Sequence, residues 1–278
     1  MPELPEVETV RMGLEARLKD KRVRKVVLGR SGLRFAFPDR FAERLEGAVL
    51  RHWLRRGKYL IIDMEEAGCL IAHLGMSGRF TVLEPDAPEA AGRHDHVVIT
   101  MQDGTRLIYS DPRRFGMMDL TAPGAWAGHR LLAGMGVEPL SNAFHAGALI
   151  DAARGRKTPI KAFLLDQRII AGLGNIYVCE ALYRAGIDPR RQAGALDPAR
   201  ELPLLAAAIP AVLREAIAAG GSSLRDYVHA DGSLGYFQYG FAVYGRAGEP
   251  CRREGCGGEI ARINQAGRSS FYCPACQH

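Results

Sequence analysis

The sequence lacks an apolar run long enough to cross a bilayer, and its start lacks the basic and then apolar pattern of a secretory signal. The chain begins instead with the acidic, proline-containing segment MPELPEVE. Hydrophobic residues at 47% and charged residues at 24% of the 278 residues are near the averages for soluble globular proteins. We therefore expect a folded cytoplasmic protein with no membrane partner.

Cysteine is nearly absent before residue 250, where only Cys69 and Cys179 occur, both in apolar runs typical of buried thiols rather than ligands. Four more cysteines form two pairs separated by the length of a hairpin, which is the arrangement of a four-thiolate zinc site. A cytoplasmic chain rarely keeps disulfides, so one structural Zn²⁺ explains this cluster better than two bridges. Four residues separate the first pair, so that knuckle is expected to bulge. The predicted ligands are Cys251, Cys256, Cys273 and Cys276.

The charge balance favours a polyanionic partner. The formal net charge is +6, although many equally basic proteins do not bind nucleic acid. Basic side chains also gather in residues 51–58, 113–114 and 154–161. Each cluster taken alone could equally be a solvated surface.

Hydrophobic periodicity divides the chain. Residues 5–19 have apolar positions at helical spacing, with Pro5 and acidic residues suited to the first turn. Residues 22–120 contain short β-rich runs, and Asp103-Gly104 between two of them predicts a hairpin. This pattern indicates an antiparallel sandwich or barrel capped by the opening helix.

The rest of the chain is predicted to be mainly helical. From about residue 122 the composition is rich in alanine and leucine, with helix starts expected at Thr158-Pro159, Asn175 and Asp197-Pro198. Pro203 and Pro210 lie within the last stretch and predict a kink there, or a later helix start. Residues 220–240 are rich in glycine, serine and aromatics, which is typical of a long mobile loop.

The first residues carry a candidate nucleophile. Removal of Met1 would give Pro2 a free secondary amine, which is reactive near neutral pH. Attack on a deoxyribose C1′ would expel the base and leave an iminium, whose charge acidifies the C2′ proton and drives β-elimination of the phosphate. This chemistry needs a neighbouring acid, and Glu3 could supply it while Glu6 orients the site. These residues alone are equally compatible with an ordinary helix entry.

Several segments appear in one order along the whole chain, namely MPELPEVETV, RRGKYL, HLGMSG, DPRRFG, GLGNIY and the cysteine hairpin. Together they resemble the bacterial formamidopyrimidine-DNA glycosylase (Fpg, or 8-oxoguanine DNA glycosylase) family. The resemblance implies an α+β multidomain fold with DNA bound in a cleft. Its expected parts are an N-terminal catalytic β-sandwich domain capped by an N-terminal helix (1–125), a helical helix-two-turn-helix DNA-binding domain with a lesion loop (126–240) and a C-terminal zinc-finger β-hairpin (244–278).

The resemblance also implies an activity, that of a bifunctional glycosylase and abasic-site (AP) lyase of base excision repair. Such an enzyme excises oxidised purines such as 8-oxoguanine and formamidopyrimidines, then cleaves the strand by β,δ-elimination. Carried over, Pro2 is the Schiff-base nucleophile, Glu3 the acid for glycosidic cleavage and Lys58 the proton donor in β-elimination. Glu6 is a supporting residue, and Arg268 on the zinc hairpin contacts a phosphate and is assigned a donor role in δ-elimination. Lys58, from its own sequence context, could also bind phosphate alone.

Base extrusion leaves a void in the duplex that side chains must fill. Met76, Arg113 and Phe115 match the family's void-filling residues, with Met76 as an adaptable plug, Phe115 as a wedge and Arg113 as a paired donor to the stranded cytosine. Ordinary strand packing is their alternative role. The loop from Ser222 to about Tyr239 resembles the segment that folds over the everted base. The expected DNA contacts are His94, Arg113, Arg156 and Asn175, the last at a helix start that could hold a phosphate.

Two other functions stay open at this point. An endonuclease VIII-type enzyme shares the N-terminal proline but prefers oxidised pyrimidines, and the presence of all three void-filling residues favours the purine enzyme instead. A non-enzymatic zinc-finger DNA-binding protein is the second alternative. The expected partner is double-stranded DNA with oxidised purines or abasic sites, bound by a monomer at the bacterial nucleoid.

Overall fold

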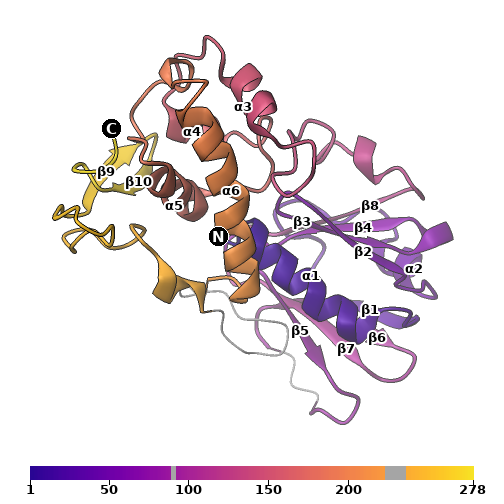
Figure 1. Ribbon diagram of the computed structural model, residues 1–278. Helices are drawn as coiled ribbons and strands as arrows, with labels where there is room; N and C mark the ends of the chain where they lie inside the picture. Colours follow the sequence, from indigo (N-terminus) through magenta and orange to yellow (C-terminus); the bar gives the residue numbers. More distant parts are fainter. Residues whose placement is uncertain (89–91, 223–235) are drawn as a thin grey trace. The chain divides into compact units, whose positions relative to one another are not determined.

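The computed structural model describes residues 1–88, 92–222 and 236–278. The chain divides into two compact units (Figure 1). Unit one comprises Met1–Gly134 with Gly220–Tyr236, and unit two comprises Met135–Ala219 with Phe237–His278. Among the described residues, none of the helices has both the length and the apolar composition that crossing a membrane requires.

Among its described residues, unit one contains two α-helices and two four-stranded sheets, in which neighbouring strands are antiparallel. The first sheet has the order β1-β6-β7-β5 and the second the order β2-β3-β4-β8. Helix α1 packs against β2, β3 and β5. The elements are α1 (Leu4–Leu18), β1 (Val23–Leu28), α2 (Phe41–Leu45), β2 (His52–Arg56), β3 (Tyr59–Asp63), η1 (Glu65–Ala67), β4 (Cys69–His73), β5 (Arg79–Leu83), β6 (Asp95–Met101), β7 (Arg106–Ser110), β8 (Met117–Thr121) and η2 (Trp126–Gly128).

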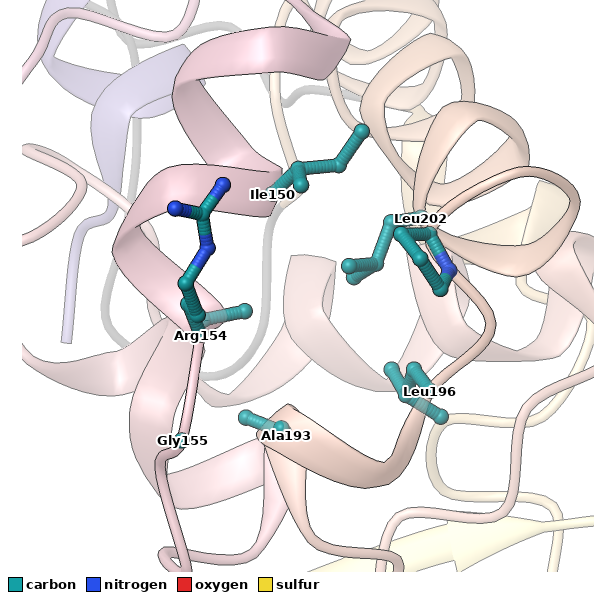
Figure 2. A pocket seen from close by; sticks show the side chains of 9 residues that line it. Ile150, Arg154, Gly155, Ala193, Leu196 and Leu202 are labelled. Carbon is teal, nitrogen blue, oxygen red and sulfur yellow. The ribbon is translucent and has the colours of Figure 1, made fainter.

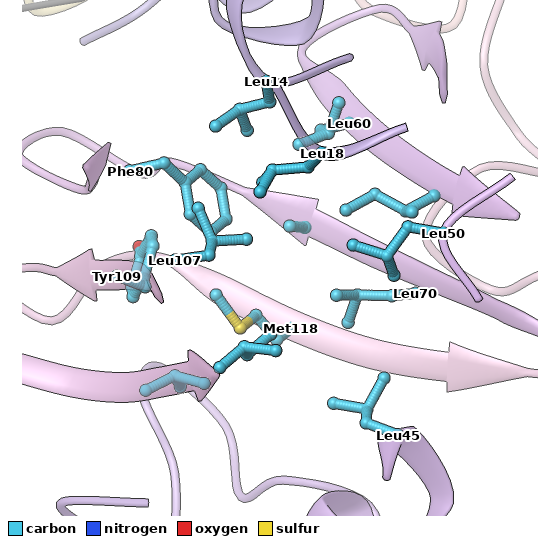
Figure 3. Close-up of a cluster of buried hydrophobic side chains, with 14 of the residues drawn as sticks. Leu14, Leu18, Leu45, Leu50, Leu60, Leu70, Phe80, Leu107, Tyr109 and Met118 are labelled. Atoms are coloured by element: carbon cyan, nitrogen blue, oxygen red, sulfur yellow. The ribbon is translucent and has the colours of Figure 1, made fainter. Parts of the chain in front are cut away.

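A single apolar core joins the two sheets and α1. Leu18 of α1 lies with Leu60 of β3 in this core, which also holds Phe80 and Leu107 from the other sheet (Figure 3). All four side chains are at most 2% exposed, and burying a side chain of this size contributes about 1.5–3 kcal/mol. The predicted β-sandwich capped by the opening helix is therefore confirmed.

The predicted hairpin at Asp103-Gly104 is also confirmed, because it joins β6 to β7. The N–H of Met101 donates to the carbonyl of Thr105 over 2.8 Å. Gly104 has a φ of +90°, which favours glycine because it lacks a Cβ atom.

Unit two contains four α-helices and a two-stranded hairpin among its described residues. Helix α5 packs against α4, α6 and strand β10, and α3 packs against α6. Glu180 of α5, which is 1% exposed, accepts hydrogen bonds from the N–H groups of Ala242, Val243 and Tyr244, and so fixes the segment before the cysteines. The elements are α3 (Ala146–Ala153), α4 (Ile160–Leu165), α5 (Asn175–Ala185), η3 (Ala193–Ala195), α6 (Glu201–Ala218), η4 (Phe237–Gly240), β9 (Ala261–Gln265) and β10 (Arg268–Tyr272).

The helix starts agree with the sequence in two cases and differ in one. Helix α4 follows Pro159, and α5 begins at Asn175. Helix α6, however, begins at Glu201 rather than at Asp197. The Asp197 side chain instead accepts the N–H of Ala199, which closes a local turn ahead of the helix.

The later start of α6 places Pro203 in the first turn, where a missing N–H costs no hydrogen bond, and the helix continues through Pro210. The predicted long loop falls mostly on residues 223–235, which lie outside the described residues.

Candidate active site and cysteine cluster

The first residues of unit one are held by a carboxylate. Pro2 is buried, and Glu3 and Glu6 are 3% and 2% exposed. Glu6 Oε2 accepts the N–H of Glu3 over 2.8 Å, and Glu6 Oε1 accepts both the N–H and the hydroxyl of Ser222 over 2.9 Å. Glu6 therefore ties the backbone beside Pro2 to the residue that precedes the undescribed part of the loop.

Lys58 lies in the two-residue turn between β2 and β3, where Gly57 has a φ of +55° that suits a tight hairpin. Its side chain is largely buried, at 6% exposed. Helix α1 packs against both strands. The turn thus presents Lys58 from a rigid sheet in the unit that also carries Pro2 and Glu3.

His73 is a site residue that the sequence analysis did not single out. Burial, together with the positive charges of Lys58 and Arg34, lowers the pKa of His73 to about 4. Nδ1 of His73 accepts the N–H of Gly75 over 2.9 Å, so the neutral ring carries its proton on Nε2. Its signal in the sequence is its place at the end of a strand, before the glycine turn of HLGMSG.

One pocket of unit one, of about 640 Å³, brings together three of the predicted residues. Arg113 lies with its guanidinium carbon 5.0 Å from the centre of the Phe115 ring, and Phe115 is 43% exposed. Met1 contributes to the same lining, so the residue expected to be removed borders this pocket. The residues that line this pocket are Met1, Leu33, Arg34, His73, Gly75, Met76, Arg113, Arg114 and Phe115.

The basic cluster at residues 51–58 is smaller than the sequence indicates. Arg51 pairs with Asp20 over 2.8 Å and with Glu65 over 3.3 Å. Arg55, with a side chain 9% exposed, pairs with Glu8 over 2.8 Å. Both arginines therefore have structural partners within unit one, so their charge is partly neutralised.

His94 and Arg156 are both exposed, His94 in unit one and Arg156 in unit two. The backbone carbonyl of His94 accepts the N–H of Asp111 over 3.0 Å. This bond does not involve the imidazole ring of His94. Nε of Arg156 donates to the carbonyl of Ala152 over 3.4 Å.

In unit two, Arg268 is the exposed first residue of β10, at the tip of the hairpin. Lys161 of α4, only 1% exposed, donates to the carbonyl of Ser269 over 2.9 Å and to the hydroxyl of Ser270 over 2.6 Å. Nδ2 of Asn175 also donates to the carbonyl of Ser269 over 2.9 Å. Oδ1 of Asn175 is buried without a hydrogen-bond partner among the described residues. Side chains from α4 and α5 thus hold β10 in place next to Arg268.

The four terminal cysteines converge, as predicted, with their sulfur atoms all within 4.8 Å of one another. The Sγ atoms of Cys251 and Cys276 lie 3.8 Å apart, and those of Cys256 and Cys273 3.6 Å apart. Zn–S bonds of about 2.3 Å in a tetrahedron place the sulfurs about 3.8 Å apart, so this donor set fits zinc. Cys69 and Cys179 are buried outside this cluster, as expected.

The cysteines of the cluster differ in their pKa: that of Cys251 is lowered, whereas burial raises those of Cys273 and Cys276. Burial acts to raise the pKa of Cys251, but the hydroxyl of Tyr183 and the N–H of Arg253 outweigh this effect and lower the pKa to about 7. The Tyr183 oxygen lies 3.3 Å from the sulfur and the Arg253 nitrogen 3.4 Å from it. A thiolate is the form of cysteine that ligates metals.

Another cavity of unit two, of about 240 Å³, lies between α3, η3 and α6 (Figure 2). Arg154 is the only charged residue in its lining, which is otherwise formed by apolar residues and glycine, including Ile150, Leu196 and Leu202. It has neither an acid nor a nucleophile, so we do not consider it a candidate active site.

Comparison with known proteins identifies the family. Three family models match, described as the formamidopyrimidine-DNA glycosylase N-terminal domain over residues 1–118, the formamidopyrimidine-DNA glycosylase H2TH domain over 135–228, and a zinc finger found in FPG and IleRS over 248–278. The chain belongs to the formamidopyrimidine-DNA glycosylase family. Formamidopyrimidine-DNA glycosylases of Ruegeria pomeroyi and Beijerinckia indica are 55% and 53% identical to it, with both chains covered completely.

Solved structures agree with this assignment. A Lactococcus lactis FPG mutant in complex with Fapy-dG-containing DNA superposes with a TM-score of 0.90 at 37% identity, with 100% of each chain covered. The Lactococcus lactis Fpg in complex with DNA containing an abasic site gives 0.89 at 36% identity, with 99% of each chain covered. The predicted fold of N-terminal domain, helix-two-turn-helix domain and C-terminal zinc finger is therefore confirmed.

The family fixes the class of activity. This chain is a DNA glycosylase of base excision repair, a DNA-formamidopyrimidine glycosylase of a family known also for AP lyase activity. A non-enzymatic zinc-finger protein is excluded, because the matching domains include the family's N-terminal domain as well as its zinc finger.

Proposed function

We propose that this enzyme excises oxidised purines, 8-oxoguanine and formamidopyrimidines, from double-stranded DNA through a Schiff base on Pro2. The amine of Pro2 bonds to C1′ of the sugar while the glycosidic bond breaks and the base leaves with a proton. The nitrogen then loses its proton, and the C1′–O4′ bond breaks as O4′ takes up a proton, which opens the sugar ring and gives the iminium. The iminium loses the C2′ proton, and the C3′–oxygen bond breaks to release the 3′ phosphate. A second elimination removes the C4′ proton and breaks the C5′–oxygen bond to release the 5′ phosphate. Relatives bound to Fapy-dG-containing and abasic DNA support this choice of substrate.

The observation that carries the proposal is the shared pocket of Met1, Met76, Arg113 and Phe115. Loss of Met1 would free the Pro2 amine at the edge of this pocket. The void left by an everted base would then be filled by Met76 and Phe115, next to the nucleophile. Arg113 would offer paired donors to the orphaned cytosine.

Two further residues of unit one have proposed catalytic roles, and a third supports the site. Glu3 is the acid for glycosidic cleavage, and its backbone is held by Glu6. Lys58 is the proton donor in β-elimination, presented by the tight turn between β2 and β3. Glu6 supports the site without contacting the substrate.

The remaining proposals concern contacts with the DNA. Arg268 at the hairpin tip binds a phosphate at the lesion and acts as a donor in δ-elimination. His94, Arg113, Arg156 and Asn175 contact the DNA, with Asn175 at the first turn of α5, where the helix dipole favours an anion.

A structural zinc ion completes the proposal, held by Cys251, Cys256, Cys273 and Cys276. Zinc bound by four thiolates has no open position for substrate, so its role would be to fold the hairpin that presents Arg268. We further propose three functional parts at residues 1–125, 126–240 and 244–278. The enzyme would act as a monomer in the bacterial cytoplasm.

Borohydride trapping tests the nucleophile. Reduction during turnover on a duplex with 8-oxoguanine opposite cytosine should give a covalent adduct, which mass spectrometry should locate on an N-terminal peptide that starts at Pro2. Pro2→Gly should retain DNA affinity and lose most of the adduct. An unmodified N-terminal peptide during full-rate cleavage would overturn the mechanism. Faster excision of thymine glycol than of 8-oxoguanine would instead favour the pyrimidine enzyme.

A further inference from the structure

Met76 and Arg113 belong to two loops of unit one, at residues 75–78 and 111–116, which are joined by a buried hydroxyl. The Oγ atom of Ser77, 7% exposed, donates to Oδ1 of Asp111 over 2.6 Å and accepts the N–H of Arg113 over 3.2 Å. Because Ser77 directly follows Met76, one side chain links the backbone beside Met76 to that of Arg113.

Asp111 is fully buried, at 0% exposed, and forms hydrogen bonds with its own loop and with residues of β6 and β7. Its Oδ2 accepts the N–H of Gly116 over 2.8 Å and the hydroxyl of Tyr109 over 3.4 Å. Nε2 of His96 lies 2.9 Å from its carbonyl oxygen. A buried carboxylate with this many donors holds the loop in one conformation, because losing any of them would leave a buried polar atom unpaired.

Gly75 lets the two loops touch through their backbones, because a Cβ atom there would lie 2.4 Å from the carbonyl carbon of Phe115. Gly116 lets the second loop pack against β7, because a Cβ atom there would lie 1.7 Å from the Tyr109 hydroxyl. Gly75 also has a φ of +63°, which strains other residues. The loops therefore pack as one body, and a shift of either would move the other.

We propose that Ser77 and Asp111 are positioning residues that set the enzyme's preference for the base opposite the lesion. By fixing the Arg113 backbone against the Met76 loop, they hold the guanidinium where it can meet the acceptors of cytosine while Met76 occupies the void. This inference rests on the proposed function, since it assigns those roles to Met76 and Arg113. The preference for cytosine over adenine is its direct readout, and a purely structural role would leave that preference unchanged.

The test uses the full-length protein and duplexes with a tetrahydrofuran abasic analogue opposite cytosine or adenine. Ser77→Ala should reduce the ratio of the two affinities by about tenfold, which is within the range for one paired base contact. Its affinity for single-stranded DNA with the same analogue, where no opposite base exists, should stay within about twofold of wild type. Asp111→Asn, which places an NH₂ group among donors, should also reduce this ratio, and a wild-type ratio in this variant would count against the role of Asp111.

Thr105→Ala is the matched control. Thr105 is also buried, at 2% exposed, and its hydroxyl accepts a hydrogen bond from Lys21 over 2.8 Å in the β6–β7 hairpin. It should lose thermal stability as Ser77→Ala does and keep the wild-type affinity ratio. The inference would be overturned if Ser77→Ala kept the wild-type ratio of the two affinities, or if Thr105→Ala lowered that ratio as much as Ser77→Ala does. Neither result would affect the proposed function. A wild-type protein that excises no 8-oxoguanine and shows no preference for cytosine would overturn the proposed function, and this inference with it.

Discussion

The Nζ atom of Lys161 lies 2.6 Å from the Oγ atom of Ser270, although 109 positions separate the two residues in the chain. The same ammonium group donates to the carbonyl of Ser269, next to Arg268. A lysine buried to 1% exposure is tolerated only where acceptors replace its hydration. This contact therefore joins α4 to the hairpin of the zinc finger within unit two.

Replacing Lys161 by methionine should loosen that hairpin. The variant keeps an unbranched side chain, one atom shorter, but leaves the Ser270 hydroxyl without this donor, so we expect a loss of about 1–3 kcal/mol in the free energy of unfolding. Urea denaturation measures it. Lys157→Met, a change at an exposed position of the same unit, is the control and should alter stability by less than about 0.5 kcal/mol. Equal stability of the two variants would show that the contact contributes nothing.

Cys273→Ser should abolish zinc binding, because a serine hydroxyl is a poor substitute for the thiolate in a four-sulfur site. Elemental analysis should show a fall from about one zinc per chain to about zero, and DNA affinity should fall with it because the hairpin unfolds. Cys69→Ala removes a thiol that is buried in unit one, far along the chain from the cluster, and should retain zinc. Wild-type zinc content and affinity in Cys273→Ser would contradict the four-cysteine site.

Local features of the fold were predictable from the sequence, because they depend on neighbouring residues. The Asp103-Gly104 turn needs only a glycine with positive φ between two alternating strands. The helix signal at Asp197-Pro198 misplaces the start of α6, because the Asp197 side chain closes a separate turn there. The later start that Pro203 and Pro210 left open is the one observed. Periodicity cannot distinguish these two outcomes.

The candidate site was only partly predictable, because long-range contacts decide what each residue can do. Arg55 belongs to one of the basic clusters of the sequence, which favour a polyanionic partner, but it pairs with Glu8 across 47 positions. Glu6 looks like a helix-capping acid, yet it also holds Ser222 across 216 positions. Ser77 and Asp111 lie within recognised motifs, but nothing local indicates that they bond to each other.

Glu6→Gln should slow base excision and weaken the start of α1. An amide would place an NH₂ group against the N–H of Glu3 or that of Ser222, and one of these buried donors would lose its acceptor, at a cost of about 1–3 kcal/mol. Single-turnover excision of 8-oxoguanine should slow while the affinity for an abasic analogue changes little. Glu15→Gln, which alters a partly exposed pair with Arg11 on the same helix, is the control. Equal rates for the two variants would remove Glu6 from its supporting role.

His73 predicts how stability depends on pH. Burial, with the charges of Lys58 and Arg34, lowers the pKa of His73 to about 4, from about 6.5 in the unfolded chain. The folded state therefore resists protonation of this ring. The contribution of neutral His73 to the free energy of unfolding is fully present above pH 6.5 and is lost as the pH falls toward 4. The shift corresponds to about 3 kcal/mol. His73→Gln, which cannot titrate, should flatten the dependence of the unfolding free energy on pH between 4 and 6.5. His52→Gln, at an exposed position in the same sheet, is the control, and a slope in His73→Gln equal to the wild-type slope would refute the assignment.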